Sequence, residues 1–429
     1  MAEWVEQYWE PDPNAGTSRR TRRGGRYQAY VPDLLNGRPI SIPQELASRA
    51  AAVERSIRGL GDLPGAGGLS AISRLLTRSE AISSSMIEGI APSSQQVAIA
   101  ELALSESVRG VSEKAQMVAN NIVILGRASR ELVARDSVTA ADIEAMHAAL
   151  LPDERYQGVR TVQNWIGGSN WNPLEADFVP PAPELVPGLL HDLVGYMNGA
   201  GHGALVQAAL VHAQFETIHP FTDGNGRVGR ALIHTVLARG GLSPEAVLPI
   251  SVVLATFRDR YVEGLTRYRY DGASTAEDGT AGHNAWLEVF VEASGLAVDQ
   301  AIRIAHEVAD LDADWHDRVV EHRTAQGIRG EPRANSAVAR ILALLPEMPV
   351  LTGRAAERVL GITFAAARSA LEELAEAGVL GRKSLDRGTT GYLARDILDL
   401  VTIAERRLAS TEFDTRSAPP NRPVPNPPM

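Results

Sequence analysis

One short stretch, His219 to Arg230, concentrates the residues of this chain that could perform chemistry. The twelve residues HPFTDGNGRVGR hold one histidine, one aspartate, three glycines, one asparagine and two arginines. A histidine with an ordinary pKa near ~6.5 can accept a proton from a hydroxyl group. Two arginines three positions apart lie on one helical face and can bind phosphate oxygens in a bidentate manner. The pattern therefore indicates a base beside a phosphate-binding loop.

The flanking elements predict how these residues are positioned. A helix over 203–217 should end just before the histidine, because Pro220 disfavours the helical conformation in its predecessor. Gly224 and Gly226 permit backbone conformations that are closed to other residues. A helix over 226–239 should then begin within the glycine-rich segment. Its free N–H groups and positive dipole end would form an anion site.

Asp223 is the one acidic side chain in this otherwise positive stretch. A carboxylate would repel a bare phosphate, whereas a carboxylate that binds Mg²⁺ would bridge the metal to a diphosphate. Histidine before proline, a glycine turn and helical arginines each occur separately in purely structural segments. Their combination in one register favours a phosphate-transfer site that holds a Mg-bound polyphosphate beside a base.

Composition excludes several classes of protein. The 429-residue chain predicts one to three domains and contains no cysteine, which excludes disulfides, thiolate zinc sites and a cysteine nucleophile. No apolar run approaches the ~18 residues of a membrane span, and no secretory signal is visible, so we expect no membrane contact and a cytoplasmic location. The lysines, Lys114 and Lys383, lie in neither a Walker-type nor a kinase context. The net charge of −10 argues against non-specific nucleic-acid binding by the whole chain.

Most of the chain has helical spacing. Residues 1–40, with the basic run Arg19–Arg26, are predicted to be a solvated tail, and a basic recognition arm is the less favoured alternative. An N-terminal helical region is expected over 41–135, its first helix capped by Ser41 with Pro43 in the first turn. Further helices are expected at 93–107, 111–134, 138–150 (capped by Ser137 or Thr139), 183–198, 203–217, 226–239, 249–268 and 284–310, with a continuation into the 320s.

Three segments depart from this pattern. Residues 158–181 alternate and contain turn signals, which predicts an irregular β-hairpin. Residues 330–400 show the order helix, helix, turn, helix and two short strands, which fits a winged helix-turn-helix domain. Residues 410–429 are rich in proline and are expected to be disordered. The expected fold class is an all-α core with a small hairpin, followed by the winged domain.

The stretch His219–Arg230 resembles the Fic-family motif H-x-F-x-[DE]-G-N-G-R-x-x-R, with every position filled. The resemblance covers roughly 40–325, with the catalytic core at 136–325. It implies an all-α enzyme that transfers AMP from ATP to a Ser, Thr or Tyr hydroxyl of a protein. Segment 160–181 resembles the family's flap, which aligns the target as an added strand.

The resemblance also implies roles for single residues. His219 is the base, Phe221 anchors the loop in the core, and Asp223 binds Mg²⁺. The retained G-N-G-R sequence favours AMP transfer over phosphorylation. The nucleotide-binding residues implied are Glu88, Gly224, Asn225, Gly226, Arg227, Gly229, Arg230 and the base-lining Tyr261, whereas Trp286 is assigned to the core.

A second motif lies far upstream. SSMIEG, Ser84 to Gly89, resembles the family's inhibitory helix motif [ST]-x-x-x-E-[GN]. A glutamate aimed at Arg230 would occupy the γ-phosphate position, and ATP could then bind only in a pose unfit for in-line attack. Ser84, Glu88 and Gly89 are therefore predicted to be inhibitory, while a plain surface Glu88 is the alternative.

The winged segment leaves several partners open. The expected recognition helix, about 363–378, offers Arg368 and Ser369 but also three glutamates. Residues 333–395 hold nine Arg or Lys against six Asp or Glu, an excess of +3, which predicts weak DNA binding unless the module dimerises. A protein-interaction or homodimer module is an equal alternative.

Three functions are therefore compared. The first is a self-inhibited protein AMP transferase that acts on a protein target and on itself. The second is a DNA-binding regulator with a Fic sensor core. The third is removal of AMP from a modified protein, with Glu88 positioning a water molecule.

Overall fold

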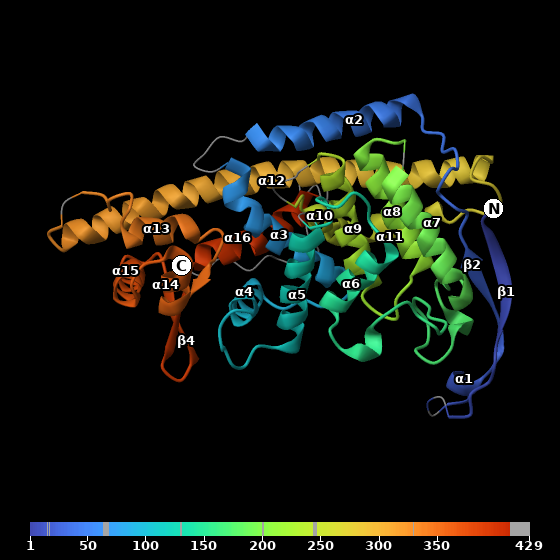
Figure 1. Ribbon diagram of the computed structural model, residues 1–429, viewed down its shortest axis with the longest axis horizontal. Coiled ribbons are helices and arrows are strands. Elements are labelled where there is room, and N and C mark those ends of the chain that lie inside the picture. Colours follow the sequence, from blue (N-terminus) through green and yellow to red (C-terminus); the bar gives the residue numbers. More distant parts are fainter. Residues whose placement is uncertain are drawn as a thin grey trace.

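The computed structural model describes residues 1–411 except 15, 17, 63–67, 129–130, 200, 243–246 and 329, so the proline-rich part of the predicted C-terminal tail lies outside the described residues. The chain is mostly helical, as predicted (Figure 1). The helices before residue 330 are α1 Arg19–Arg22, α2 Gln44–Gly59, α3 Gly68–Ile87, α4 Ser94–Ala103, α5 Glu113–Ala128, α6 Ala140–Leu150, α7 Val186–Gly199, α8 Ala204–Ile218, α9 Asn225–Arg239, α10 Ile250–Thr256, α11 Arg258–Tyr268 and α12 Glu277–Ala325.

Helix α12 extends across the molecule, with α2 packed along it (Figure 1). The adjacent α8 and α9 are buried along almost their whole length, so the segment that joins them is held by the core. Within the described part of the chain, no helix combines the length and apolarity that a membrane span needs.

Several predicted boundaries differ from the structure. Helix α2 begins at Gln44 after Pro43, and no side chain caps it, so Ser41 does not have its predicted role. Thr139 is the cap of α6 and accepts a hydrogen bond from the N–H of Asp142. The helix predicted over 249–268 is two helices, because the backbone leaves the helical region at Phe257 (φ −103°, ψ 47°).

The prediction of a solvated N-terminal tail was wrong. Strands β1 (Glu3–Trp9) and β2 (Gly25–Val31) form an antiparallel hairpin. Its alternating half-buried positions face the core, and Trp9 packs edge-on against Trp165 at 5.4 Å between ring centroids. In the basic run, Arg20 and Arg23 form ion pairs with Glu175. Aromatic packing and these pairs order a segment whose composition suggested only solvation.

Segment 158–181 is less regular than the predicted hairpin. It closes through one antiparallel bridge between Ile166 and Phe178, with a 3₁₀ turn at Pro173–Glu175. Backbone hydrogen bonds join Ile166 to Phe178 and Asp177, and Tyr30 of β2 donates its N–H to the carbonyl of Val179 at 2.9 Å. The N-terminal hairpin therefore supports this segment.

Helix α3 is anchored to the core by a buried carboxylate. Glu80 is fully buried and accepts hydrogen bonds from His234 Nε2 of α9 at 2.9 Å and from both the N–H and the hydroxyl of Ser251 in α10. A buried carboxylate with three donors resists displacement, because each broken bond leaves an unpaired polar group. The end of α3, which carries Glu88, is thus held at a fixed place over α9.

The C-terminal part forms helices and a small sheet against α12. Its elements are α13 Ala337–Leu344, β3 Val350–Leu351, α14 Gly353–Leu360, α15 Phe364–Glu376, β4 Gly381–Asp386, β5 Thr389–Leu393 and α16 Arg395–Thr411, with strand order β3-β5-β4. Buried Arg78 of α3 donates to Glu101 of α4 at 2.5 Å and to the carbonyl of Glu347 at 3.0 Å. One arginine therefore joins α3, α4 and the C-terminal part.

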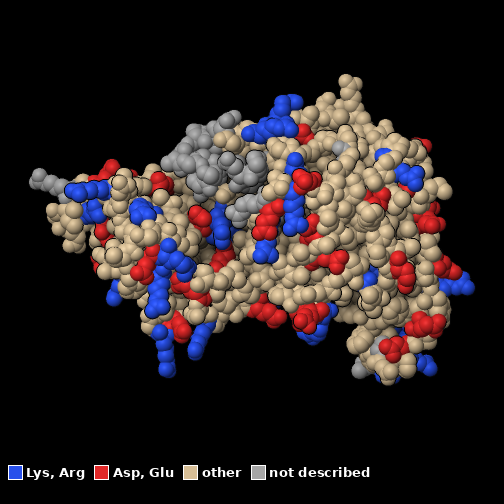
Figure 2. Space-filling view, in the orientation of Figure 1, with Lys and Arg blue, Asp and Glu red and all other residues tan. Residues whose placement is uncertain are grey.

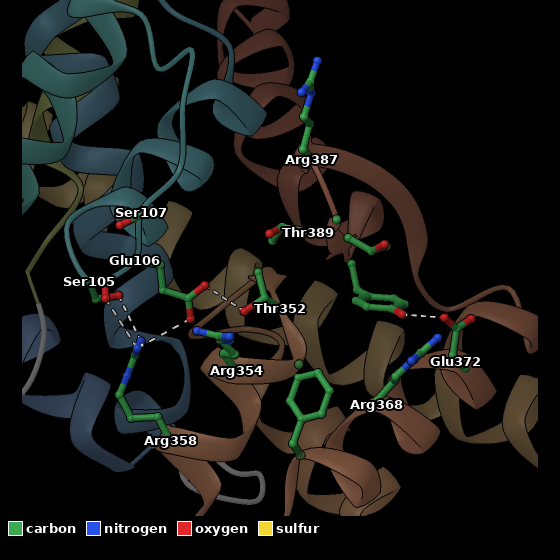
Figure 3. Close-up of a pocket in the computed structure, with 15 residues that line it drawn as sticks. Ser105, Glu106, Ser107, Thr352, Arg354, Arg358, Arg368, Glu372, Arg387 and Thr389 are labelled. Carbon is green, nitrogen blue, oxygen red and sulfur yellow. Dashed lines mark hydrogen bonds and ion pairs between the residues drawn. The ribbon is translucent and has the colours of Figure 1, made fainter.

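Basic side chains gather on the C-terminal part, over and around the β4–β5 hairpin (Figure 2). Next to this hairpin, a polar cavity of about 750 Å³ is lined by residues of the C-terminal part and by Ser105, Glu106 and Ser107 (Figure 3). None of its lining residues belongs to the stretch His219–Arg230.

Candidate active site

His219 has an unusual backbone conformation that fixes its position. It follows the last residue of α8 and adopts the left-handed conformation (φ 50°, ψ 59°), the one residue other than glycine with positive φ in the described part of the chain. Such a conformation costs of order 1–3 kcal/mol and persists only where the surroundings enforce it. Here the N–H of His219 remains bonded to the carbonyl of Phe215, which ties the turn to α8.

Hydrogen bonds from Arg160 help to hold this backbone conformation. Its Nε donates to the carbonyl of His219 at 2.8 Å, one Nη donates to the carbonyl of Pro181 at 2.5 Å, and its backbone N–H donates to the carbonyl of Pro220 at 2.9 Å. The side chain is buried, and burial lowers its pKa to about 10. Sequence reasoning missed this residue, because an arginine at the edge of an irregular segment carries no motif signal.

Burial also lowers the pKa of the His219 ring. The side chain is half-buried, and desolvation lowers its pKa to about 4, an effect that Arg160 and Arg269 reinforce and the backbone of Glu216 opposes. A neutral imidazole is the form that can accept a proton. The ring is therefore in the state that a general base requires at neutral pH.

The turn after His219 is locked by side-chain-to-backbone bonds. Asn225 accepts from the N–H of Phe221 at 2.8 Å and donates to its carbonyl at 2.7 Å. Buried Phe221 stacks on His147 with 3.9 Å between ring centroids, and His147 Nε2 lies 2.9 Å from the carbonyl of Asp223. The anchoring predicted for Phe221 is present, whereas His147 was not foreseen.

Helix α9 begins at Asn225, directly after Gly224 in the left-handed conformation (φ 77°). Its first N–H groups therefore point into the loop, where the helix dipole favours an anion. Buried Arg227 and Arg230 come from the first two turns of this helix. The structure thus brings the predicted anion-binding elements to one place.

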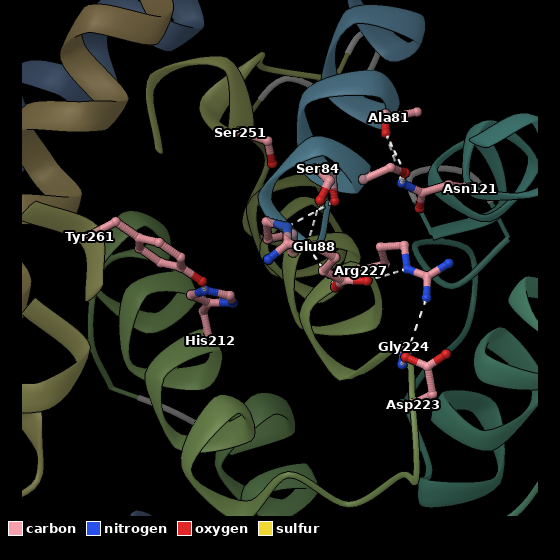
Figure 4. Close-up of polar contacts among 12 residues, drawn as sticks. Ala81, Ser84, Glu88, Asn121, His212, Asp223, Gly224, Arg227, Ser251 and Tyr261 are labelled. Carbon is pink, nitrogen blue, oxygen red and sulfur yellow. Dashed lines mark hydrogen bonds and ion pairs between the residues drawn. The ribbon is translucent and has the colours of Figure 1, made fainter. Parts of the chain in front are cut away.

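Glu88 contacts both of these arginines, and its carboxylate lies beside Arg227 in Figure 4. One carboxylate oxygen lies 2.5 Å from Arg227 Nε and the other 2.9 Å from Arg230 Nη2. Ser84 completes the contact, because Arg230 donates to its hydroxyl at 2.8 Å and to its carbonyl at 2.7 Å. The predicted pairing with Arg230 is present, and the pairing with Arg227 adds to it. Gly89 follows in the left-handed conformation (φ 79°), just past the end of α3.

Two glycines of α9 permit this close approach. A Cβ on Gly226 would lie 2.4 Å from Glu88 Oε1, and a Cβ on Gly229 would lie 2.6 Å from Glu216 Oε1. Glu216 is a buried carboxyl one helical turn before His219, and burial raises its pKa to about 7. It was not predicted, although its helical spacing from the histidine is visible in FETIHP.

Tyr261 lines a small, mostly apolar hollow together with Leu254 and Phe257. It is buried, and its hydroxyl lies 2.9 Å from His212 Nε2. Trp286, fully buried beside it, donates to the carbonyl of Ala209, which places Trp286 in the core as expected. Burial lowers the pKa of Arg230, but Glu88 and the nearby Tyr261 outweigh this effect and raise it.

Asp223 is half exposed at the mouth of the loop and lies 3.7 Å from Arg227 Nη2. No group of three or more metal-ligating side chains occurs among the described residues. A single accessible carboxylate nevertheless fits Mg²⁺ that arrives with phosphates, because this ion keeps several waters and needs one or two protein carboxylates.

Comparison with known proteins gives consistent matches. Residues 137–237 match the model of the Fic/DOC family. The probable protein adenylyltransferase of Aquifex aeolicus is 43% identical over 68 residues, which are 16% of this chain and 21% of that protein. Protein adenylyltransferase fic-1 of Caenorhabditis elegans is 31% identical over 137 residues, 30% of this chain and 25% of that protein.

A solved Fic family protein from Desulfovibrio desulfuricans G20 aligns with 83% of this chain and 98% of its own, at 20% identity and a TM-score of 0.49. The chain spans about a fifth to a quarter of the two curated relatives. The family match runs from just before α6 into α9 and includes the whole loop around His219. Residues 137–237 therefore match the Fic/DOC family, as the motif within them indicated.

Proposed function

We propose that this chain is a self-inhibited protein AMP transferase that uses ATP to modify a hydroxyl group of a protein target or of itself. The observation that carries the proposal is that the two carboxylate oxygens of Glu88 contact two different arginines, Arg227 and Arg230, at the start of α9. It fills an anion site with a carboxylate from a helix distant in sequence. The names of the curated relatives, protein adenylyltransferases, support the same activity.

The residues have separate tasks in this proposal. The N-terminus of α9 and its two arginines hold the phosphates of ATP. Neutral His219 takes the proton of the target hydroxyl as its oxygen attacks the α-phosphorus. The bond from the α-phosphorus to the oxygen that bridges to the β-phosphate breaks, and diphosphate leaves. Mg²⁺ on Asp223 would neutralise charge on the phosphates.

Two further parts of the chain have roles in this proposal. Segment 160–181 serves as the flap for a target strand, and its support by the N-terminal hairpin fits that task. Residues 330–400 form a winged helix-turn-helix domain, supported by the order α13, β3, α14, α15, β4, β5. Removal of AMP from a modified protein would use the same site. The Glu88→Gly variant distinguishes the two reactions, because AMP removal needs Glu88 and AMP transfer does not.

The position of the label in ATP tests the proposal. We expect the protein to incorporate label from ATP marked at the α-phosphate and none from ATP marked at the γ-phosphate, because diphosphate carries the γ-label away. Denaturing electrophoresis followed by autoradiography measures both. Incorporation of the γ-label would show phosphorylation and overturn the proposal.

The lowered pKa of His219 predicts an unusual pH profile. The ring is neutral above about 4, so the base remains available at pH 5, where an ordinary histidine with pKa ~6.5 is mostly protonated. We expect transfer by a Glu88→Gly variant to show no loss centred near ~6.5. A rate that halves there would contradict the assignment.

Two controls accompany this profile. Burial raises the pKa of Glu216 to about 7, so this group titrates in the same range. The pH profile of transfer is therefore repeated with Glu216→Gln, and the pH below which the rate falls should stay the same. Stability also falls as pH drops from ~6.5 towards about 4, because the unfolded histidine binds its proton before the folded one. Circular dichroism at each pH therefore confirms that the protein is folded.

A further inference from the structure

A second basic site lies in the cavity of about 750 Å³ between the C-terminal part and residues 105–107 (Figure 3). Its walls come from the start of α14, the start of α15 and the turn between β4 and β5, while Ser105, Glu106 and Ser107 form the opposite side. The cavity shares no residue with the loop around His219. It has no task in the proposed reaction.

The elements around the cavity have the geometry of a helix-turn-helix. Helices α14 and α15 are joined by a three-residue turn that begins at Gly361 in the left-handed conformation (φ 61°). Phe364 and Arg368, from the first turns of α15, line the cavity, and Arg387 lines it from the β4–β5 turn. In this motif the first residues of the second helix contact base edges in the major groove.

The acidic residues of α15 do not oppose this use. Each of its three glutamates has a basic partner that lies outside the cavity lining: Glu372 with Arg382 at 2.5 Å, Glu373 with Arg323 at 2.6 Å and Glu376 with His322 at 3.7 Å. Glu372 also accepts from the hydroxyl of Tyr392 at 2.6 Å. Glu372, which lines the cavity, and Glu373 are therefore paired with arginines, which the sequence alone could not show.

Three cavity arginines keep their charge available. Arg354, Arg368 and Arg387 line the cavity, and within the described residues their guanidinium groups make no hydrogen bond or ion pair. They come from α14, α15 and the β4–β5 turn, so the three charges belong to three different elements that line the cavity. Spaced cations of this kind match the repeated phosphates of a nucleic-acid backbone.

Glu106 covers part of this surface. It accepts a hydrogen bond from the Thr352 hydroxyl at 2.8 Å and lies 3.5 Å from Arg358 Nη1, while Arg358 Nη2 donates to the Ser105 hydroxyl at 3.0 Å. Thr352 is the N-cap of α14, so this carboxylate lies at a helix N-terminus where a backbone phosphate would bind. Residues 107–112, which follow it, form no helix or strand.

We propose that this cavity is a duplex-DNA site, with α15 in the major groove and Arg354, Arg368 and Arg387 on phosphates, and that residues 105–106 partly close it. Glu106 takes the place of one phosphate in the absence of DNA. Binding displaces it from Thr352 and Arg358. The site is independent of the proposed AMP transfer, because it needs neither ATP nor His219.

Fluorescence anisotropy of the full chain with a labelled random duplex of about 20 base pairs tests the site without ATP. At about 50 mM salt we expect a dissociation constant in the micromolar range. Arg368→Ala and Arg387→Ala should each weaken binding at least about fivefold and reduce the salt slope by about 0.9, the value for one phosphate on duplex DNA. Arg55→Ala, an exposed arginine of α2 away from the cavity, is the matched control and should bind like the parent.

The Glu106→Gln variant tests whether DNA must displace the Glu106 carboxylate from Thr352 and Arg358 in order to bind. Removing a carboxylate that competes for one phosphate position should strengthen binding about threefold. Equal affinity of parent and Glu106→Gln would overturn the displacement, and equal affinity of Arg368→Ala and Arg55→Ala would overturn the site. Competition by ATP or inorganic phosphate as strong as by duplex at equal charge would show an anion site only and overturn the DNA assignment. Circular dichroism confirms that each variant is folded.

Discussion

We expect a Glu88→Gly variant to incorporate AMP label from ATP on the order of tenfold or more faster than the parent. The reason is the geometry at the start of α9, where one carboxylate holds both Arg227 and Arg230. ATP must displace it before its γ-phosphate can reach the arginine, and the displaced charge would still repel the phosphate. Removal of that buried ion pair and correction of the phosphate pose together account for a few kcal/mol, hence tenfold or more.

The assay is incorporation of α-labelled ATP at matched protein concentrations. Glu321→Gln, an exposed glutamate of α12, is the control and should match the parent. The variant should remain folded, because Glu80 and Arg78 still hold α3, and any decrease in melting temperature measures the cost of leaving Arg227 and Arg230 unpaired. Equal incorporation by parent and Glu88→Gly, with ATP bound to both, would make Glu88 a structural residue. A variant that loses activity would instead support AMP removal.

His219→Ala in the Glu88→Gly background should reduce transfer by about 10²–10⁴ while ATP binding stays close to that of the background. The base is lost, whereas the start of α9 and its arginines are unchanged. ATP affinity by calorimetry and label transfer by autoradiography separate the two effects. Residual transfer within about tenfold would remove His219 from the role of base.

The backbone of His219 requires a second variant. An alanine in the left-handed conformation is strained, so His219→Ala could disturb the loop as well as the chemistry. Asparagine tolerates this conformation but cannot act as a base, so His219→Asn should lose transfer equally with less effect on stability. His191→Ala, an exposed histidine of α7, is the control.

The sequence predicted the site well where chemistry and local structure depend on neighbouring residues. The turn at His219, the start of α9 near Gly226 and the inward arginines follow from Pro220, the glycines and helical spacing. The pairing of Glu88 with Arg230 also agrees, although it joins residues 142 positions apart. In that case the contact was predicted from the resemblance to a family motif and not from the local sequence.

Residues that act through tertiary contacts were not predictable. Arg160 and His147 hold the backbone of the loop from separate segments, and their types occur too often at random positions to stand out. The N-terminal hairpin was missed for a related reason. Its polar and basic composition suggested solvation, while its order depends on Trp165 and Glu175, which lie far along the chain.

The arginine at position 78 has a thermodynamic consequence. Arg78 lies in α3, which carries Glu88, and its buried guanidinium group hydrogen-bonds to α4 and to the backbone at Glu347. By linkage, if a ligand of the C-terminal part changes the affinity for ATP through this contact, ATP must change the affinity for that ligand by the same factor. The size of that coupling free energy would follow from the affinity of each ligand measured with and without the other.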